Sequence, residues 1–123
     1  MLRESYKRKI KDIREVNPKM KVVDVTPTSN SPLSPSPELI SDFRNNRITW
    51  DEFKERFTKE MNTPTIEAML LDIARQAVNE DIYLICYEAR GHCHRTILLD
   101  LIEELAAKNK IPVKIEKTKH VIE

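Results

Sequence analysis

Apolar residues along the chain follow two patterns, a helical spacing and short unbroken runs. An unbroken apolar run of strand length predicts a strand that is covered on both faces, and the clearest example spans residues 81–86. A β-branched segment between two prolines predicts a strand at 21–26. A third strand is predicted at 112–116, and residues 120–122 either continue it or pair separately.

Helices are predicted where apolar residues recur every three or four positions, and most of them begin at a capping residue. Ser36 precedes a proline at the first helical position, and Thr49 and Glu52 have the spacing of a capping box. The aromatic stripe that follows Thr49 is interpreted as core. The five predicted helices span about 2–15, 37–45, 50–61, 64–77 and 93–108.

Strands and helices alternate along the chain, which predicts the α/β class. We expect a single domain over residues 1–123, with a small parallel or mixed sheet flanked by helices in a Rossmann-like three-layer arrangement. The domain begins with a basic N-terminal helix within residues 1–18. Residues 27–37 hold four prolines and four serines, and we predict that they form an ordered loop near the functional site.

Composition narrows the class of protein. The chain has 123 residues, of which 33% are charged, and its mean hydropathy is -0.52. No apolar run reaches the length of a membrane span and no signal peptide is predicted, so no membrane association is expected. Two cysteines in a chain of this size are expected as thiols, which predicts a cytoplasmic protein. Nothing in the sequence indicates an oligomeric state.

Charge is divided unevenly along the chain. The net charge is +5 over residues 1–22, -7 over residues 23–107 and +3 over residues 108–123, so basic ends flank an acidic middle. Basic ends suit nucleic acid or another polyanion. However, only Tyr6 lies among the N-terminal charges, and nucleic-acid surfaces usually hold several aromatic residues. Solvated chain ends explain the pattern as well, so nucleic acid is a weak candidate partner.

The residues that carry chemistry gather in one segment, 86–95, between a predicted strand and a predicted helix. In open α/β sheets, ligands bind beyond the carboxyl ends of the strands, where a helix N-terminus attracts anions. We therefore predict a pocket for an anionic small molecule or nucleotide, which is also a candidate catalytic site. The candidate catalytic residues are Cys86 and Cys93 as nucleophiles and Glu88 and His94 as acid or base, and the candidate ligand-binding residues are Arg90, Gly91 and Arg95.

Gly91 is the only glycine of the chain. We expect it to form the turn into the helix or to allow a ligand to approach the backbone closely. Because glycine is otherwise absent, we expect the rest of the backbone to adopt ordinary dihedral angles.

The same segment contains donors for a metal ion. Cys86, His92, Cys93 and His94 are zinc ligands by residue type, but three of them are consecutive, which hinders convergence on one ion. We therefore expect no metal and no other cofactor.

A non-enzymatic binding or assembly module is the alternative function. In that case Cys86 belongs to the core, and Arg95 forms a buried ion pair with Glu88 that fixes the loop. Cys93, His94 and Arg95 exposed around a pocket would favour the anion site. The same side chains buried and hydrogen-bonded to one another would favour the structural role.

The segment Leu84-Ile85-Cys86-Tyr87-Glu88, followed by Cys93-His94-Arg95, resembles the signature of the YeaO-like family, the domain of unknown function four-eight-eight. In that signature, Leu-Leu-Cys-x-Glu is followed by a short variable loop and by Cys-His-Arg at a helix start. Residues 34–39 and 50–57 resemble further segments of the family, and the resemblance covers about residues 5–121. It implies a three-layer α/β domain with this signature at the mouth of the sheet, and it implies no particular reaction.

Overall fold

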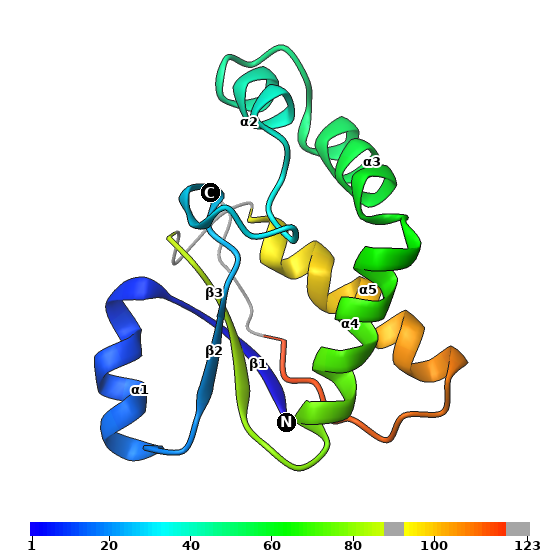
Figure 1. The fold of residues 1–123 in the computed structure, drawn as a ribbon. Coiled ribbons are helices and arrows are strands. Elements are labelled where there is room, and N and C mark those ends of the chain that lie inside the picture. The colour runs from blue at the N-terminus through cyan, green and yellow to red at the C-terminus, as the bar shows by residue number, and fades with distance from the viewer. Residues whose placement is uncertain (88–92, 118–123) are drawn as a thin grey trace.

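Three parallel strands form the centre of the fold in the computed structural model, which describes residues 1–87 and 93–117 (Figure 1). The strands are β1 (Leu2–Tyr6), β2 (Lys21–Asp24) and β3 (Ile82–Cys86), in the spatial order β1-β3-β2. The helices are α1 (Ile10–Val16), α2 (Pro37–Arg44), α3 (Trp50–Met61), α4 (Pro64–Ala77) and α5 (His94–Lys108), with 3-10 turns at Lys7–Lys9 and Pro27–Ser29. None of these helices has the length and apolar character that crossing a membrane requires. The predicted α/β class and parallel sheet are confirmed.

β3 is the central strand, and its alternate side chains face two different hydrophobic clusters. Ile82 and Leu84 pack in the larger cluster with residues of α3, α4 and α5. Tyr83 and Ile85 pack with Met20 and with residues of α1 in the smaller cluster. Because all five residues of β3 are buried, its sequence is nearly continuous in apolar residues. Helices lie on both faces of the sheet, α1 on one side and α4 and α5 on the other, which confirms the three-layer arrangement (Figure 1).

The helix starts follow the predicted capping chemistry. The Ser36 side chain accepts a hydrogen bond from Leu39 N at the start of α2. Thr49 and Glu52 form both hydrogen bonds of a capping box at the start of α3. Phe57 and two further side chains of α3 are buried in the core, as predicted. These caps fix where α2 and α3 begin, and α2 follows the Pro/Ser-rich loop directly.

The prediction for the N-terminus is wrong in its first half. Leu2–Tyr6 is the strand β1, and the helix is confined to Ile10–Val16. β1 pairs with β3 along its whole length. Leu2 and Glu4 are buried while the residues between and after them are half-buried, which is the alternation of a strand. Pairing outweighed the helical spacing, because the backbone groups along β3 need hydrogen-bond partners on both sides.

The strand predicted at 112–116 is reduced to a single bridge. Leu2 pairs in parallel with Ile115. Leu2 N donates a hydrogen bond of 2.8 Å to Lys114 O, and Leu2 O accepts one of 2.9 Å from Glu116 N. This segment therefore lies along the outer side of β1 without forming a strand of its own. Residues 120–122, the predicted continuation, lie outside the described residues.

Among the described residues, three that are not glycine adopt a left-handed backbone conformation, so the expectation of ordinary dihedral angles is wrong. Asn30, Asn46 and Lys110 each have a φ of 56°. Asparagine tolerates this region better than most residues because its side chain can hydrogen-bond locally. Asn46 and Lys110 each lie one position beyond the C-cap of a helix, where a left-handed residue commonly ends the helix. The chain thus makes these turns without glycine.

Candidate functional site at the carboxyl edge of the sheet

The carboxyl ends of β2 and β3 and the N-terminus of α5 meet at one edge of the sheet. Beyond the end of β2, Val25 N donates a hydrogen bond of 3.0 Å to Ile85 O in β3. β3 ends at Cys86, and α5 begins at His94. The ligand atoms of Cys86, Cys93 and His94 lie within 4.8 Å of one another. The fold thus brings three of the predicted site residues to one point.

Cys93 has the surroundings of a stabilised thiolate. It is the N-cap residue of α5, so the unpaired backbone N–H groups of the first helical turn lie next to it. A hydrogen bond from the Cys86 thiol is the largest influence on its pKa, and burial, the next largest, opposes it. With the further contributions of His94 and the backbone N–H of Arg95, the pKa of Cys93 is lowered from 9.0 to about 5. These surroundings favour the thiolate form of Cys93.

His94 has a fixed orientation beside Cys93. Its Nε2 donates a hydrogen bond to the carbonyl oxygen of Val25, since a carbonyl oxygen can only accept. Its Nδ1 therefore lies on the side of Cys93, and the two atoms Nδ1 and Sγ are 3.9 Å apart. The ring also meets the fully buried ring of Phe57 at an interplanar angle of 79°. His94 can accept a proton at Nδ1 without turning its ring.

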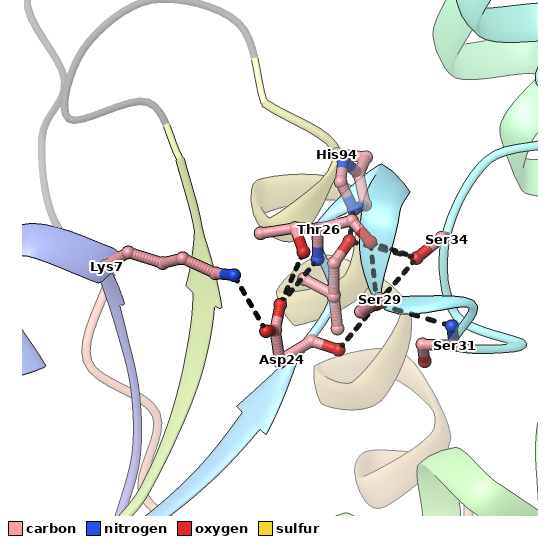
Figure 2. A network of polar contacts seen from close by, with 8 residues as sticks. Lys7, Asp24, Thr26, Ser29, Ser31, Ser34 and His94 are labelled. Atoms are coloured by element: carbon pink, nitrogen blue, oxygen red, sulfur yellow. Dashed lines mark hydrogen bonds and ion pairs between the residues drawn. The ribbon is translucent and has the colours of Figure 1, made fainter.

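Hydroxyl groups of the Pro/Ser-rich loop form hydrogen bonds with the backbone carbonyls that follow β2, one of which orients His94 (Figure 2). Ser34 Oγ lies in donor position 3.2 Å from Val25 O and 2.8 Å from Thr26 O. Ser29 Oγ donates to Thr26 O at 2.6 Å. The loop is therefore hydrogen-bonded to the end of β2 at the point where His94 also binds. The loop lies beside the candidate site, and its functional role stays a prediction.

Asp24 connects this network to β1. Its Oδ1 accepts hydrogen bonds from Thr26 N and Thr26 Oγ1, at 2.9 and 2.7 Å. Figure 2 shows Lys7 reaching across to the same carboxylate, with Nζ 3.2 Å from Oδ2. Burial, the largest influence, raises the pKa of Asp24, but the hydrogen bonds from Thr26 and Lys7 together lower it below 3.8. Lys7 also lies 4.7 Å from the centre of the Tyr87 ring, so one cation connects the ends of all three strands.

A cavity of about 130 Å³ adjoins the thiol cluster. Besides Cys86, Cys93 and His94, its lining comes from the Pro/Ser-rich loop, α2 and the aromatic side chains that begin α3. Arg44, at the end of α2, is the one arginine or lysine among the described residues that line it. This volume holds about four water molecules at their liquid volume. A small functional group therefore fits beside Cys93, and the whole of a large substrate does not.

Arg95 is not among the residues that line this cavity. Its side chain is fully buried, and its Nε lies 3.8 Å from Oε1 of Glu4, which is buried in β1. The sequence suggested Glu88 as the partner in a structural ion pair. The partner that the structure shows is Glu4, and Glu88 lies outside the described residues. The guanidinium is compensated inside the protein, which favours a structural role for Arg95.

Comparison with known proteins places this site in a family. A family model described as the active DUF488-N3 subclade matches residues 7–106. The chain belongs to the DUF488 family. The match includes β2, β3 and every described residue around the cavity, and it agrees with the resemblance of the Cys-His-Arg segment. No curated protein and no solved structure matches the chain. Because the family name records no reaction, the chemistry of the site rests on its geometry.

The same three residues are the candidate ligands for a metal ion in this DUF488 member. Consecutive residues were expected not to converge, but Cys93 and His94 do, with Cys86 as the third donor. A closed zinc site takes four protein ligands. Among the residues that the structure describes, no fourth histidine, cysteine or carboxylate joins the cluster. The absence of a metal stays a prediction, and the three donors do not make a closed structural site.

Part of the predicted segment lies outside the described residues, namely Glu88, Arg90, Gly91 and His92. The roles predicted for these residues stay predictions.

Sequence reasoning missed four groups at or near the site. The Val25 carbonyl and the Arg44 side chain carry no local signal, because the chain folds them against Cys93 and His94 from distant positions; Val25 and His94 are 69 positions apart. Phe57 was identified as core, but its contact with His94 was not. Glu4 could have been found from the strand alternation of β1.

Proposed function

We propose that this protein is an enzyme in which the Cys93 thiolate is the nucleophile that transfers a small group from an anionic substrate. The observation that carries the proposal is the cluster of Cys93 with the Cys86 thiol and Nδ1 of His94, at the lining of a cavity. A structural cysteine needs neither a stabilised thiolate nor an adjoining cavity. A nucleophile needs both.

The proposed reaction has two steps. Cys93 Sγ attacks the electrophilic atom of the substrate, and a bond to sulfur forms while the bond to the leaving group breaks. The leaving group keeps the electron pair of that bond and takes the proton from Nδ1 of His94. In the second step, His94 takes a proton from water or another acceptor, which attacks the transferred group, and Cys93 leaves as a thiolate. The hydrogen bond from Cys86 stabilises that thiolate.

An anionic substrate is favoured by two features around the cavity. The first turn of α5 presents backbone N–H groups and the positive end of its dipole beside Cys93. Arg44 adds a positive charge to the lining. The volume of about 130 Å³ limits the transferred group to the size class of a phosphate or carboxylate group. A nucleotide or a product of nucleic-acid breakdown belongs to this class of ligands.

The alternative, a binding or assembly module, draws support from burial. Cys86, Cys93 and His94 are each no more than 4% exposed, and Arg95 is paired with Glu4 in the interior. A structural cluster, however, is stabilised by close packing, and a void beside it is unfavourable. The cavity beside Cys93 therefore favours the enzyme.

Alkylation by iodoacetamide at pH 6 tests the proposal. At this pH a thiol with a pKa of 9 is about 0.1% ionised, whereas one with a pKa near 5 is about 90% ionised. A thiolate of lower pKa is intrinsically less nucleophilic, which offsets part of this difference, so the native protein should react at Cys93 about tenfold faster than the same chain in urea. Peptide mass spectrometry locates the label, and EDTA in the buffer keeps metal ions from masking the thiols.

Two variants serve as matched controls for this reaction. Cys86→Ser retains a hydrogen-bond donor beside Cys93 and should still react rapidly at Cys93. Cys93→Ser should lose the rapid phase, because it removes the proposed nucleophile. Equal rates for the native and unfolded chains, or rapid labelling at Cys86 alone, would overturn the proposal.

A further inference from the structure

A larger groove adjoins the cavity beside Cys93. Its volume is about 730 Å³, and it runs along the Pro/Ser-rich loop and α2. The groove and the cavity share Pro27, Pro35, Ile40 and Arg44 in their linings, so they form two parts of one continuous depression. The rest of the groove is lined by serine, asparagine and proline side chains. Hydroxyl and amide groups of this kind form hydrogen bonds with a polar ligand.

The protein holds this groove in shape through its own hydrogen bonds. Glu60 in α3 accepts hydrogen bonds from Ser36 N at 2.9 Å and from Ser36 Oγ at 2.5 Å. Ser34 Oγ bonds the loop to the carbonyl groups of Val25 and Thr26. These contacts fix the loop on both sides of Pro35. Ligand sites are usually preformed in this manner.

Arg44 differs from the other arginines nearby. Arg47 and Arg56 both form ion pairs with Asp42, at 3.2 and 2.8 Å. The Arg44 side chain is exposed, and within the described ranges 1–87 and 93–117 it makes no ion pair or hydrogen bond. It is also the only arginine or lysine among the described residues that line either the cavity or the groove. Its five N–H donors are therefore available where the two parts of the depression meet.

We propose that Arg44 determines substrate specificity by binding an anionic group, a phosphate or a carboxylate, of the molecule that reacts at Cys93. The planar guanidinium can donate two parallel hydrogen bonds to such a group. The reactive end of the substrate then enters the small cavity, and its polar remainder lies in the groove of serine and asparagine side chains. This inference rests on the proposed function of Cys93. It assigns to Arg44 the anion-binding role that the sequence suggested for Arg95.

Two alkylating reagents of nearly equal size test this assignment. Iodoacetate carries a carboxylate, and iodoacetamide is its neutral counterpart. Both form a bond between Cys93 Sγ and the methylene carbon, and iodide leaves with the electron pair of the C–I bond. The rate ratio of iodoacetate to iodoacetamide at Cys93, divided by the same ratio for glutathione, measures recognition of the anion. We expect this normalised ratio to be about tenfold above one in the native protein at low salt, and to fall as salt screens the charge.

Arg44→Glu should lower the normalised ratio to one or below. Arg75→Glu is the matched control, since Arg75 is also an exposed arginine in the last turn of its helix but lines neither the cavity nor the groove. Arg75→Glu should leave the ratio unchanged, and circular dichroism should show that both variants are folded.

The outcomes separate the inference from the function on which it rests. A ratio that falls in Arg44→Glu and not in Arg75→Glu supports the assignment. A ratio that is the same in the native protein and both variants, with Cys93 still reacting rapidly, overturns the role of Arg44 and leaves the nucleophile in place. No rapid reaction of Cys93 with either reagent overturns both.

Discussion

Two polar pairs lie at the start of α5, and they differ in what surrounds them. Cys93 and His94 face each other at the lining of a cavity. Arg95, the next residue, is directed into the core beside Glu4 and lines no part of that cavity. Because successive residues of a helix are rotated by about 100°, neighbours in sequence enter different surroundings. A continuous Cys-His-Arg motif is therefore divided between the cavity lining and the core, and we propose that the first pair is reactive and the second structural.

Burial does not distinguish these pairs, since His94 is 4% exposed and Arg95 is fully buried. The two pairs differ in whether their charges can be neutralised by transfer of a proton within the pair. Cys93 and His94 can exchange a proton between sulfur and Nδ1, so both charges can be neutralised. The buried Arg95 guanidinium needs the Glu4 carboxylate as its counterion. Substitutions at Arg95 should therefore affect folding, whereas substitutions at Cys93 or His94 should affect reactivity.

The largest expected effect follows removal of the arginine. Arg95→Met leaves the Glu4 carboxylate buried without its cation, and we expect a loss of about 3–5 kcal/mol in the free energy of unfolding, measured by urea titration. The double variant Glu4→Leu with Arg95→Met removes both charges and should recover most of this loss. A loss below about 1 kcal/mol in the single variant would contradict the structural role of the pair.

The next largest effect concerns the thiolate. His94→Ala removes the imidazole beside Cys93, so the pKa of Cys93 should rise from about 5 toward 9. We expect its alkylation at pH 6 to slow by at least about tenfold while the variant remains folded. The alkylation rate of Cys93 is measured by quenching the reaction at timed intervals and mapping the labelled peptides. Circular dichroism checks that the variant is folded. An unchanged rate would show that His94 does not stabilise the thiolate.

A smaller effect is expected in the loop that holds the Val25 carbonyl. Ser34→Ala removes the hydroxyl that bonds to Val25 O and Thr26 O. We expect a loss of about 1 kcal/mol in the free energy of unfolding, and a slower alkylation of Cys93 because His94 is less firmly oriented. Thr65→Ala, at an exposed position in α4 that lines neither the cavity nor the groove, is the control and should change neither quantity. A loss of stability without any change in the alkylation rate of Cys93 would show that the loop does not affect the reactivity of Cys93.

The smallest expected effect is the change in stability at low pH that depends on Asp24. The pKa of folded Asp24 is below its ordinary value of 3.8, so the ionised carboxylate stabilises the fold above pH 3.8 and this contribution is lost as pH falls through the lower, folded value. Because the side chain is 38% exposed, the contribution should not exceed about 1 kcal/mol. Asp24→Asn should have a lower free energy of unfolding than the native protein near neutral pH. The difference between the two, measured by urea titration, should shrink below pH 3.8. A constant difference across this range would contradict the assignment.

Much of the fold could be predicted from local patterns. The capping residues Ser36 and Thr49 and the apolar run of β3 predicted their elements correctly, because caps and burial act over a few residues. β1 was missed since its charges resemble a solvated helix, and only the pairing with β3 reveals the strand. The left-handed turn at Asn30 was missed because the scarcity of glycine was taken as a lack of such turns.

The candidate site was also predictable only as far as it depends on residues that are close in the sequence. The concentration of cysteine and histidine at a strand end located Cys86, Cys93 and His94, which depend on neighbouring segments. That Arg44 and not Arg95 lines the cavity could not be predicted, because it depends on the tertiary fold.

The central claim is that Cys93 is a stabilised thiolate beside an accessible cavity. The pH dependence of its alkylation by iodoacetamide tests this most directly, with the rate at Cys93 followed from pH 4 to pH 10 by peptide mass spectrometry. We expect a single transition with a midpoint near pH 5 and a constant rate above pH 7. A rate that keeps rising to a midpoint near pH 9, as for an ordinary thiol, would contradict the account.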